Sequence, residues 1–384
     1  MMNRKIKVLF LIHDLGGGGA EKVLVSLVNH MDHNRFDVCV VSLFGGGINE
    51  QALSPLVRYR SVWKKPFPGN SRIMRRLPSK WLHRICIKER SNVEIAYLED
   101  VCAKIVSGDS STDTKRICWI HTDLHEHSTA SRGFSCFQEA TSAFSRFDQI
   151  VCVSETVKRD YLRVFPQIKN ATVRYNTLET ERILSLKDAP VEETQFRADE
   201  INLIAVGKIT VNKGFDRLAR ILKRLRDDGL PVHMYVLGEG PDRPQIEAWL
   251  RDHGLTEAYT FLGYQTNPYQ YMAKCDLFVC ASHSEGFSTA ATEALIVGTP
   301  VCTVEVSGMK EMLGENNEWG VVTINDDEAL YEGVKKLVAD PDLLAYYKKQ
   351  AKIRGVSFST ENTVKAVEEL IEEVCKECPV NSPS

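Results

Sequence analysis

Two glutamates separated by seven residues, Glu285 and Glu293, occupy positions where a carboxylate could bind a ligand. The apolar, β-prone run from Asp276 to Ala281 precedes them and predicts a buried strand. Ser288 or Thr289 then offers an N-cap to an apolar helix. Glu285 is therefore expected in a loop at the carboxyl end of a strand, and Glu293 in the early turns of the next helix. In open α/β sheets, ligands bind at such strand ends.

The helix predicted to begin near Ser288 suits an anionic ligand. Its first backbone N–H groups have no partner within the helix, and they favour an anion such as a phosphate. Glu285 is close enough to address the other end of the same ligand, where a carboxylate suits paired hydroxyl groups of a sugar or ribose. Either glutamate alone would be interpreted as an ordinary surface residue, so this hypothesis depends on other residues of the chain.

The second half of the chain places further polar residues at predicted strand ends. Lys208 and Lys213 follow one predicted strand, and the loop from Gly238 to Pro241, which contains Glu239, follows the next. Because the carboxyl ends of parallel strands share one edge of a sheet, these groups are expected near the two glutamates. Two lysines that converge on a helix N-terminus predict a diphosphate site.

A glycine run near the start of the chain also indicates a ligand loop. Gly17, Gly18 and Gly19 follow a predicted strand and precede a predicted helix, an arrangement that lets the backbone approach a ligand closely. A dinucleotide site fits poorly, because Lys22 stands where a third glycine belongs, and no acidic residue ends the next strand. The run alone is a weak signal, since a tight turn explains it as well.

His121 follows a predicted strand over 115–120 and therefore lies at a strand's carboxyl end. That is a functional location in a doubly wound sheet. A lone histidine is more often structural than catalytic, so this residue needs support from elsewhere in the chain.

Strands and helices alternate through both halves of the chain, with a polar, acidic stretch between the halves. This pattern predicts an α/β fold of two doubly wound, Rossmann-like domains that face each other across a cleft. We expect an N-terminal domain over 1–184 with a basic insertion at 58–90, a linker over 185–200, a C-terminal domain over 201–359, a helix over 360–378 that packs back toward the first domain, and a frayed tail over 379–384.

The basic insertion differs in character from the rest of the chain. Residues 58–90 hold eleven Lys and Arg against one acid, so their formal charge is +10 and the remainder of the chain carries −13. Basic residues interleaved with tryptophan and aliphatic side chains suit an anionic membrane surface or an acceptor at that surface. We expect this contact to involve Trp63, Lys64, Lys65, Arg72, Arg75, Arg76 and Trp81.

Two other interpretations of this insertion are weaker. Nucleic acid is also a polyanion, but no recognised nucleic-acid motif accompanies the insertion, so no nucleic-acid partner is predicted. A solvated basic face on a helical insertion would also explain the composition, without any partner.

Length and composition fit two globular domains: 384 residues, 43% hydrophobic and 26% charged. The first residues lack signal-peptide composition, and no apolar run approaches the ~18 residues that a membrane span needs. The eleven cysteines are dispersed, and the one CxxC, Cys375 to Cys378, has no partner pair for a zinc site. We therefore expect a cytoplasmic protein with reduced cysteines and no metal site, peripheral at the inner face of the cell membrane.

These residues together resemble the retaining glycosyltransferases of family 4, which have the two-domain GT-B fold. The resemblance extends over nearly the whole chain. It rests on Gly17-Gly18-Gly19-Ala20-Glu21, on Val206-Gly207-Lys208 with Lys213-Gly214, on Gly238-Glu239-Gly240-Pro241, and on Glu285-Gly286-Phe287 through Glu293. The chain departs from the family at Lys208, usually Arg, and at Ser288 and Thr289, where the family is usually more apolar.

The resemblance implies a role for each residue. Glu293 would hold the ribose, Lys208 and Lys213 the diphosphate, and Glu285 the donor sugar, while His121 would be the active-site histidine of the N-terminal domain. The implied catalytic residues are His121 and Glu285. The implied donor-binding residues are Gly17, Gly18, Gly19, Lys208, Lys213, Glu239, Gly286, Phe287, Ser288, Thr289 and Glu293.

The activity implied is transfer of a hexosyl or N-acetylhexosaminyl group, with retention, from a nucleoside-diphosphate sugar. UDP is favoured over GDP by family habit. The acceptor would be a hydroxyl of a lipid-linked glycan, in the assembly of surface polysaccharide or glycolipid. No cofactor and no metal are expected, because the lysines can neutralise the leaving diphosphate and no Asp-x-Asp cluster is placed to bind a cation.

Four alternatives share some of these features. A nucleotide-sugar epimerase or a phosphorylase can use a two-domain fold of this kind, and an epimerase would turn over the donor without an acceptor. A sugar-nucleotide sensor or a membrane scaffold without catalysis would keep its function when Glu285 and His121 are changed.

Overall fold

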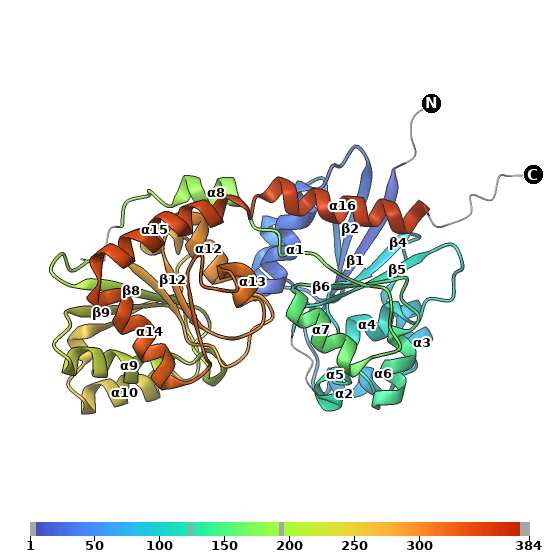
Figure 1. The fold of residues 1–384 in the computed structure, drawn as a ribbon. Helices are drawn as coiled ribbons and strands as arrows, with labels where there is room; N and C mark the ends of the chain where they lie inside the picture. Colours follow the sequence, from blue (N-terminus) through green and yellow to red (C-terminus); the bar gives the residue numbers. More distant parts are fainter. Residues whose placement is uncertain (1–4, 123–125, 192–195, 377–384) are drawn as a thin grey trace, which may run out of the picture. The chain divides into compact units, whose positions relative to one another are not determined.

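The computed structural model describes residues 5–122, 126–191 and 196–376. The predicted tail over 379–384 and residues 192–195 of the predicted linker lie outside this description. The chain divides into two compact units, of which the first contains Met1–Leu178 and Thr360–Ser384 and the second contains Glu179–Ser359. Each unit is a doubly wound α/β layer structure around one parallel sheet, so the predicted fold class is confirmed (Figure 1).

The first unit is built around a seven-stranded parallel sheet. Its strands in spatial order are β3 (Arg58–Trp63), β2 (Phe36–Phe44), β1 (Ile6–Ile12), β4 (Val93–Ala96), β5 (Lys115–Ile120), β6 (Gln149–Cys152) and β7 (Ala171–Val173). Strand β1 is apolar at nearly every position because helices cover both faces of a parallel sheet.

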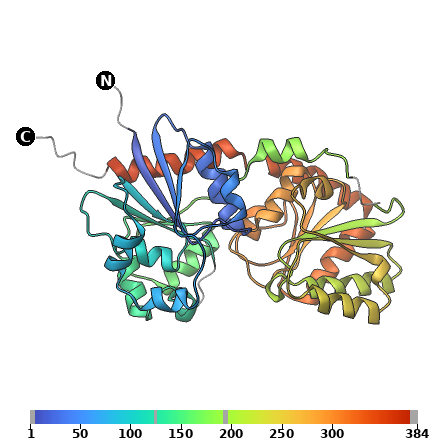
Figure 2. The same cartoon turned by 180° about the vertical axis from the view of Figure 1, so that it is seen from behind.

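Helices cover both faces of this sheet (Figures 1 and 2). One face carries α1 (Gly19–His30) and α16 (Thr360–Lys376), with the short turn η1 (Ile48–Ala52) beside α1. The other carries α2 (Asn70–Arg76), α3 (Ser79–Cys86), α4 (Val101–Val106), α5 (His127–Ala130), α6 (Phe137–Phe144) and α7 (Glu155–Val164).

Helix α16 belongs to the first unit although it ends the described chain. Its apolar side is buried. Glu368 accepts a hydrogen bond from the backbone N–H of Asp32 (2.6 Å) and forms an ion pair with Arg35 (2.9 Å). The side chain of Arg174 also donates to the carbonyl of Ala366 (2.9 Å). These contacts tie α16 to both ends of the first unit's sheet.

The second unit contains a six-stranded parallel sheet. Its order is β10 (Tyr259–Gly263), β9 (Val232–Leu237), β8 (Ile201–Val206), β11 (Leu277–Cys280), β12 (Val301–Val304) and β13 (Val321–Thr323). One face carries α9 (Phe215–Asp227), α10 (Arg243–Asp252) and α14 (Asp327–Ala339), and the other carries α8 (Thr180–Leu186), α12 (Thr289–Val297) and α15 (Pro341–Val356) (Figure 1). Short elements complete it: η2 (Val211–Lys213), η3 (Thr256–Ala258), α11 (Tyr269–Met272) and α13 (Met309–Leu313).

The boundary between the units lies at residue 178, six residues before the predicted end of the N-terminal domain. Helix α8 therefore belongs to the second unit, where the hydroxyl of Thr180 donates to the carbonyl of Phe358 (2.9 Å). The predicted linker also begins inside this helix, because Leu186 is its last residue. The short polar helix carried no periodic signal strong enough to separate it from a linker.

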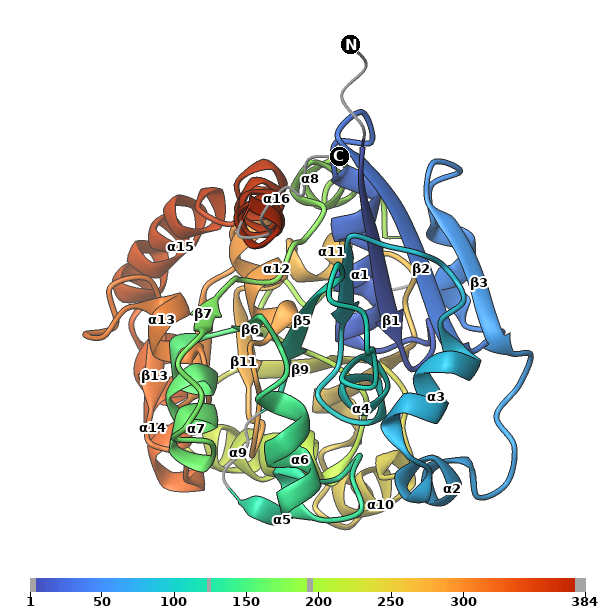
Figure 3. The ribbon, with the colours of Figure 1, turned by 90° about the vertical axis from the view of Figure 1, so that its right-hand side faces the viewer.

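The predicted basic insertion is only partly an insertion. Residues 58–63 form β3, the edge strand that pairs in parallel with β2 (Figure 3). Arg58 pairs with Asp37 (3.1 Å), and Arg60 pairs with Glu89 (2.5 Å), so the first two of its arginines are used within the unit. The remainder of the segment contains α2 and α3, and its exposed basic side chains lie on these helices and in the stretches before and after them.

In both sheets the strand order reverses direction next to the first strand of the unit, between β1 and β4 and between β8 and β11. At such a switch point the loops after the two neighbouring strands diverge to opposite faces and leave a crevice at the carboxyl ends. The loops after β8 and β11 contain five of the predicted donor-binding residues, namely Lys208, Lys213, Gly286, Phe287 and Ser288.

Candidate active site

A lysine and a glutamate meet at the switch point of the second unit. The Nζ atom of Lys213, at the end of η2, lies 2.5 Å from Oε1 of Glu285, which follows β11. The hydroxyl of Ser282 donates to the same carboxylate oxygen (2.8 Å). Both side chains keep some exposure, 32% for Lys213 and 12% for Glu285, so a ligand can reach the pair. The structure therefore brings together two of the predicted site residues.

Backbone contacts hold the loop that carries Glu285. The side-chain amide of Asn212 donates to the carbonyl of Ser284 (3.1 Å), and the backbone N–H of His283 donates to the carbonyl of Asn212 (2.8 Å). The buried guanidinium of Arg217 donates to the carbonyl of Ala281 (3.1 Å) at the start of the loop. The loops after β8 and β11 thus form one hydrogen-bonded assembly.

Glycines permit this close approach of neighbouring loops. Gly214 has φ +66°, and a Cβ atom there would lie 2.1 Å from the carbonyl oxygen of Ala281. Gly238, with φ +131°, would place a Cβ 1.9 Å from the carbonyl oxygen of Gly207. Only glycine satisfies both the positive φ and the contact distance at these two positions.

Helix α12 begins next to the pair. Ser288 is its N-cap, and its side-chain oxygen accepts from the backbone N–H of Ala291 (3.3 Å), while Thr289 is the first helical residue. The Ser288 hydroxyl is therefore used to cap the helix. Phe287 is buried at 6% exposure, and Gly286 precedes it with partial exposure. The helix N-terminus nevertheless adds its dipole to the positive potential at this edge.

Glu293 is buried within α12, at 4% exposure. Its Oε1 atom accepts a hydrogen bond from the hydroxyl of Tyr269 (3.2 Å), the first residue of α11. It therefore lies deeper in the second unit than Glu285, which remains half-buried.

Lys208 and Glu239 lie at the same sheet edge and are exposed. Glu239 pairs with Arg243, the first residue of α10 (2.9 Å). Lys208 follows β8 directly, and because β8 and β9 are neighbours, both loops face the same edge as Glu285.

The glycine loop of the first unit surrounds the start of α1. Gly18 is the N-cap, Gly19 is the first helical residue, and Gly17 lies beside η1. The loop is held from both sides, because the N–H of Gly16 donates to Asp14 (2.7 Å) and the side chain of Asn49 donates to the carbonyl of Gly16. The fold of this loop suits close approach of a ligand.

His121 lies at the carboxyl end of β5 in the first unit. Its ring packs against Tyr97, with 4.8 Å between ring centroids, and burial lowers the pKa of the imidazole to about 3. The ring is consequently neutral at physiological pH. Its backbone N–H donates to Glu99 (3.1 Å), which also accepts from the hydroxyl of Thr122. This carboxylate fixes the turn that carries the histidine.

The predicted surface residues of the basic segment do not all remain at the surface. Trp63 is half-buried in an aromatic cluster with Phe44 and Phe67, at centroid distances of 5.7 and 5.6 Å, and its contact with a membrane or acceptor stays a prediction. The Nε atom of Arg75 donates to the carbonyl of Phe134 (2.5 Å), so this guanidinium contacts the protein itself.

Helices α2 and α3 present the rest of the segment to solvent. Trp81 is 57% exposed and Ile73 is 47% exposed. Around them the basic side chains of Lys64, Lys65, Arg72, Arg76, Lys80 and Arg84 are exposed. This surface, which we call the α2–α3 basic face, combines positive charge with exposed apolar side chains.

Sequence reasoning missed the residues that hold the candidate site together, namely Ser282, Asn212, Arg217 and Tyr269. Ser282 stands three residues before Glu285, a spacing typical of a local side-chain turn, and this was the one available signal. The other three act across 24 to 72 residues of sequence. Only the folded chain shows those contacts.

Two family models match the chain and together cover most of it. Residues 17–182 match the glycosyltransferase family 4 model, and residues 187–354 match the model for glycosyl transferases group 1. The two parallel Rossmann-like sheets and the site at their strand ends define the GT-B class of fold. The chain belongs to the family 4 glycosyltransferases.

Individual relatives agree with this assignment. A Campylobacter jejuni N-acetylgalactosamine-N,N'-diacetylbacillosaminyl-diphospho-undecaprenol 4-alpha-N-acetylgalactosaminyltransferase is 31% identical over 193 residues, 50% of each chain. The lipopolysaccharide core biosynthesis glycosyltransferase LpsD of Rhizobium meliloti is 27% identical over 39% of this chain and 43% of its own. The chain thus spans about half the length of the curated relatives it matches.

A solved structure gives the same fold. The structure of Anabaena Alr3699/HepE in complex with UDP superposes with a TM-score of 0.74 at 17% identity, and the match covers 96% of this chain and 100% of that one. Within the described residues, we find no helix with the length and apolar composition required to cross a bilayer.

Proposed function

We propose that this protein transfers a sugar, with retention, from a nucleoside-diphosphate sugar to a hydroxyl of a lipid-linked glycan. The observation that carries this proposal is the Lys213–Glu285 pair, which lies in the loops after β8 and β11, beside the N-terminus of α12. A cation, a carboxylate and a helix N-terminus in one place suit a diphosphate joined to a sugar. The names of the relatives, which act on lipid-linked and lipopolysaccharide acceptors, support the acceptor class.

Donor binding would exchange the partners of the pair. A diphosphate is a stronger partner for Lys213 than a single carboxylate, and Glu285 then becomes available to the sugar hydroxyls. Ser282 continues to donate to Glu285 and holds its orientation. Lys208 and the α12 N-terminus add positive potential, which stabilises the charge that develops on the leaving diphosphate.

Other residues would orient the remaining parts of the donor. The Glu293 carboxylate, held by Tyr269, would accept hydrogen bonds from a ribose. Neutral His121 would act near the transferred sugar as a hydrogen-bonding group. We assign sugar positioning to Glu285, with the leaving phosphate assisting deprotonation of the acceptor. UDP is the proposed nucleotide, and the UDP complex of the structurally similar HepE supports it.

The α2–α3 basic face is the proposed contact with the membrane. Its arginines and lysines would attract anionic lipid, while Trp81 and Ile73 would enter the interface. This contact would place the protein at the inner face of the membrane, where a lipid-linked acceptor is available.

A ligand panel tests the donor class first. We expect UDP, and then a UDP-sugar, to raise the melting temperature, because a ligand at a hundredfold its Kd adds about 2.7 kcal/mol of stability. GDP and ADP serve as matched controls. A melting temperature that responds to none of the nucleotides would contradict the proposed donor site.

Transfer is tested separately with the donor so identified. Incubation with a polyprenyl-diphosphate-linked glycan should give a product one sugar longer, and proton NMR of the new linkage should show the anomeric configuration of the donor. Donor consumption that is equally fast without acceptor would support an epimerase instead. An inverted linkage would contradict retention.

A further inference from the structure

Three side chains that can bind a metal meet in the first unit, away from the candidate active site. They are His83 on α3, Glu94 on β4, and Asp109, which lies three residues beyond the end of α4. One ligand atom of each lies within 4.8 Å of the ligand atoms of the other two. The Nε2 atom of His83 is 2.8 Å from the Glu94 carboxylate. Three separate segments thus supply one nitrogen and two carboxylates.

The carboxylate of Asp109 is buried and only half satisfied. Asp109 is 6% exposed. Its Oδ1 atom accepts from the backbone N–H of Ser111 (2.9 Å), whereas Oδ2 is shielded from solvent and has no hydrogen-bond partner among the described residues. An unpaired carboxylate oxygen in a buried site costs free energy unless a proton or a cation neutralises it.

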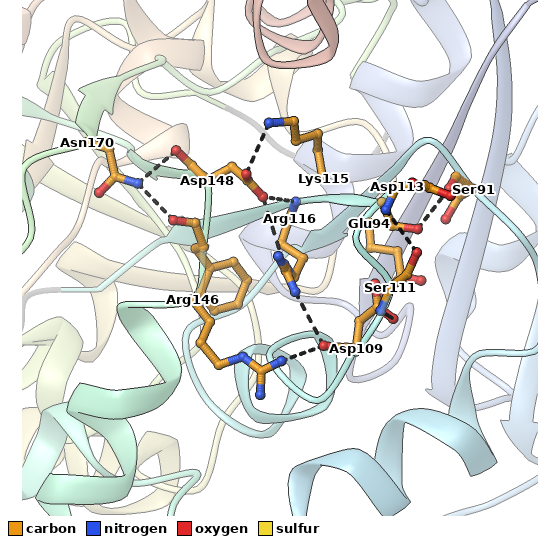
Figure 4. A network of polar contacts seen from close by, with 12 residues as sticks. Ser91, Glu94, Asp109, Ser111, Asp113, Lys115, Arg116, Arg146, Asp148 and Asn170 are labelled. Carbon is orange, nitrogen blue, oxygen red and sulfur yellow. Dashed lines mark hydrogen bonds and ion pairs between the residues drawn. The ribbon is translucent and has the colours of Figure 1, made fainter. Parts of the chain in front are cut away.

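The neighbouring arginines do not supply this missing partner (Figure 4). Arg116 and Arg146 both donate to the backbone carbonyl of Asp109, at 3.3 and 2.6 Å, and make no hydrogen bond to its side chain. Asp148 accepts from the backbone N–H of Arg116 (2.8 Å) and pairs with Lys115 (3.3 Å). Lys115, Arg146 and the Nη1 atom of Arg116 therefore contact other acceptors, whereas Nε of Arg116 is buried and makes no hydrogen bond among the described residues, to Asp109 or to any other acceptor.

Glu94 has the same electrostatic problem. It is 3% exposed, so its carboxylate lies in the same shielded surroundings as that of Asp109. Two carboxylates in one buried site repel each other, and a divalent cation between them would remove this repulsion.

We propose that His83, Glu94 and Asp109 form a binding site for a divalent transition metal, with Zn²⁺ as the matching ion. One imidazole nitrogen with two carboxylates is a donor set that zinc accepts, whereas Ca²⁺ and Mg²⁺ prefer more oxygen ligands. Zinc–ligand bonds of about 2.1 Å place tetrahedral ligands roughly 3.4 Å apart. The present spacing needs only small side-chain shifts to reach that value, and His83 exchanges its hydrogen bond to Glu94 for the metal.

The role of this site is structural. Glu94 lies at the amino-terminal part of β4, whereas His121 lies at the carboxyl end of neighbouring β5, so the metal is at the opposite edge of the sheet from the predicted chemistry. Bound metal would fasten α3 to β4 and to the segment after α4. Because α3 carries Trp81, the metal would hold part of the α2–α3 basic face in place.

Metal titration of the full-length protein tests the proposal. After treatment with a chelator, calorimetry with Zn²⁺ should give one site, and Co²⁺ should give a ligand-field spectrum without thiolate charge-transfer absorption. Asp109→Asn keeps the side-chain size and the bond to Ser111, yet it should weaken binding at least tenfold. His83→Gln should weaken it similarly. Asp113→Asn, an exposed aspartate in the same segment, and His253→Asn are matched controls that should leave binding unchanged.

Two results would overturn the site. One is a wild-type protein that binds neither ion, and the other is unchanged affinity in both Asp109→Asn and His83→Gln. Amide hydrogen exchange gives a second readout, since Zn²⁺ should slow exchange in α3 of the wild type and not in Asp109→Asn. The sugar-transfer assay is independent of both measurements, so failure of this proposal and failure of the proposed function are distinguishable.

Discussion

The carboxylate of Glu285 has two partners in the unliganded second unit, Lys213 and Ser282. In the Lys213–Glu285 ion pair each side chain neutralises the charge of the other, so neither charge alone attracts or repels ligands. A sugar diphosphate satisfies both partners together, because its phosphates bind the lysine and its hydroxyls bind the carboxylate. Inorganic phosphate satisfies only one of them.

Replacing Glu285 by Gln separates these two contributions. Glutamine keeps an oxygen for Ser282 but loses the charge that pairs with Lys213, so we expect sugar transfer to fall roughly 10²–10³-fold. The free energy of unfolding should change by less than about 1 kcal/mol, since the pair is partly solvated. Steady-state kinetics with chemical denaturation measures both quantities.

The control for this variant is Glu328→Gln, which breaks an exposed ion pair with Arg224 (2.7 Å) between α14 and α9. Its activity should match the wild type. Full transfer activity in Glu285→Gln would show that this residue does not position the sugar.

The buried imidazole of His121 makes a prediction about pH. Its pKa is about 3 in the folded protein, against 6.5 for an unperturbed histidine. Between these values the unfolded chain binds a proton that the folded chain does not, so this residue lowers the free energy of unfolding as the pH falls. We expect His121→Asn to lose less stability than the wild type between pH 6.5 and pH 4, as measured by urea unfolding.

The same substitution at the exposed His253 is the control, and it should leave the pH dependence unchanged. An identical slope in His121→Asn and the wild type would mean that the imidazole is solvated and charged over this range.

At the scale of elements, the two glycine-dependent loops are the most sensitive part of the site. Gly214→Ala imposes positive φ on alanine and drives its Cβ into the carbonyl of Ala281. Gly229→Ala has the same φ problem, at +81°, but no atom lies within 4 Å of the added methyl group. The two variants therefore differ only in the contact.

We expect Gly229→Ala to cost about 1–2 kcal/mol of stability from backbone conformation alone. Gly214→Ala should cost more than this and should also weaken nucleotide binding, because it displaces the loop that carries Glu285. Thermal unfolding with and without UDP measures both effects. Equal costs for the two variants would show that the loops adjust without strain.

The α2–α3 basic face makes a prediction at the same scale. Replacing Arg72 and Arg76 by Ser should weaken binding to vesicles of anionic lipid roughly 30-fold at low salt, at about 1 kcal/mol per charge. Replacing Trp81 by Ala should weaken binding at high salt as well, because its contribution is apolar. Co-sedimentation with anionic and with neutral vesicles measures these losses.

The exposed Lys348 and Lys349 of the second unit, changed to Ser, are the matched control and should not alter sedimentation. Wild-type protein that fails to sediment with anionic vesicles at low salt would contradict the membrane contact.

Strands with a continuous apolar sequence could be predicted from the sequence. Features that depend on contacts with other parts of the fold could not. Strand β1 is apolar at every position except Lys7, and the position of Glu285 follows from the buried strand before it. By contrast, β3 contains Arg58 and Arg60, because charged residues are tolerated on a strand at the edge of a sheet. This basic composition led to the prediction that the whole segment is an insertion. The cluster of His83, Glu94 and Asp109 follows no metal-binding spacing in the sequence, and only the fold brings it together.

At the scale of the whole molecule, the second unit is a continuous segment within the first. The fragment 179–359 has its own core, and its ends are joined by the hydrogen bond between Thr180 and Phe358. We expect this fragment to fold cooperatively when produced alone and to gain stability from UDP. Circular dichroism during heating, with and without UDP, measures both.

The complementary fragment 1–178 should behave differently. It lacks α16, whose buried residues Val364, Val367, Leu370, Ile371 and Val374 cover an apolar face of the first unit. We expect it to be less stable than the same fragment joined by a linker to 360–376.

A fragment 179–359 that stays unfolded, while the full chain binds UDP, would contradict this view of the second unit.

The return of the chain at Thr360 also has a consequence for protein synthesis. All seven strands of the first sheet leave the ribosome before the second unit, but α16 follows only after residues 179–359. At about 5–20 residues per second, the wait is roughly 10–40 s. Throughout that interval the nascent first unit shows the apolar surface that α16 later covers, and it is then a target for chaperones. The half that is translated first is therefore the half whose folding finishes last.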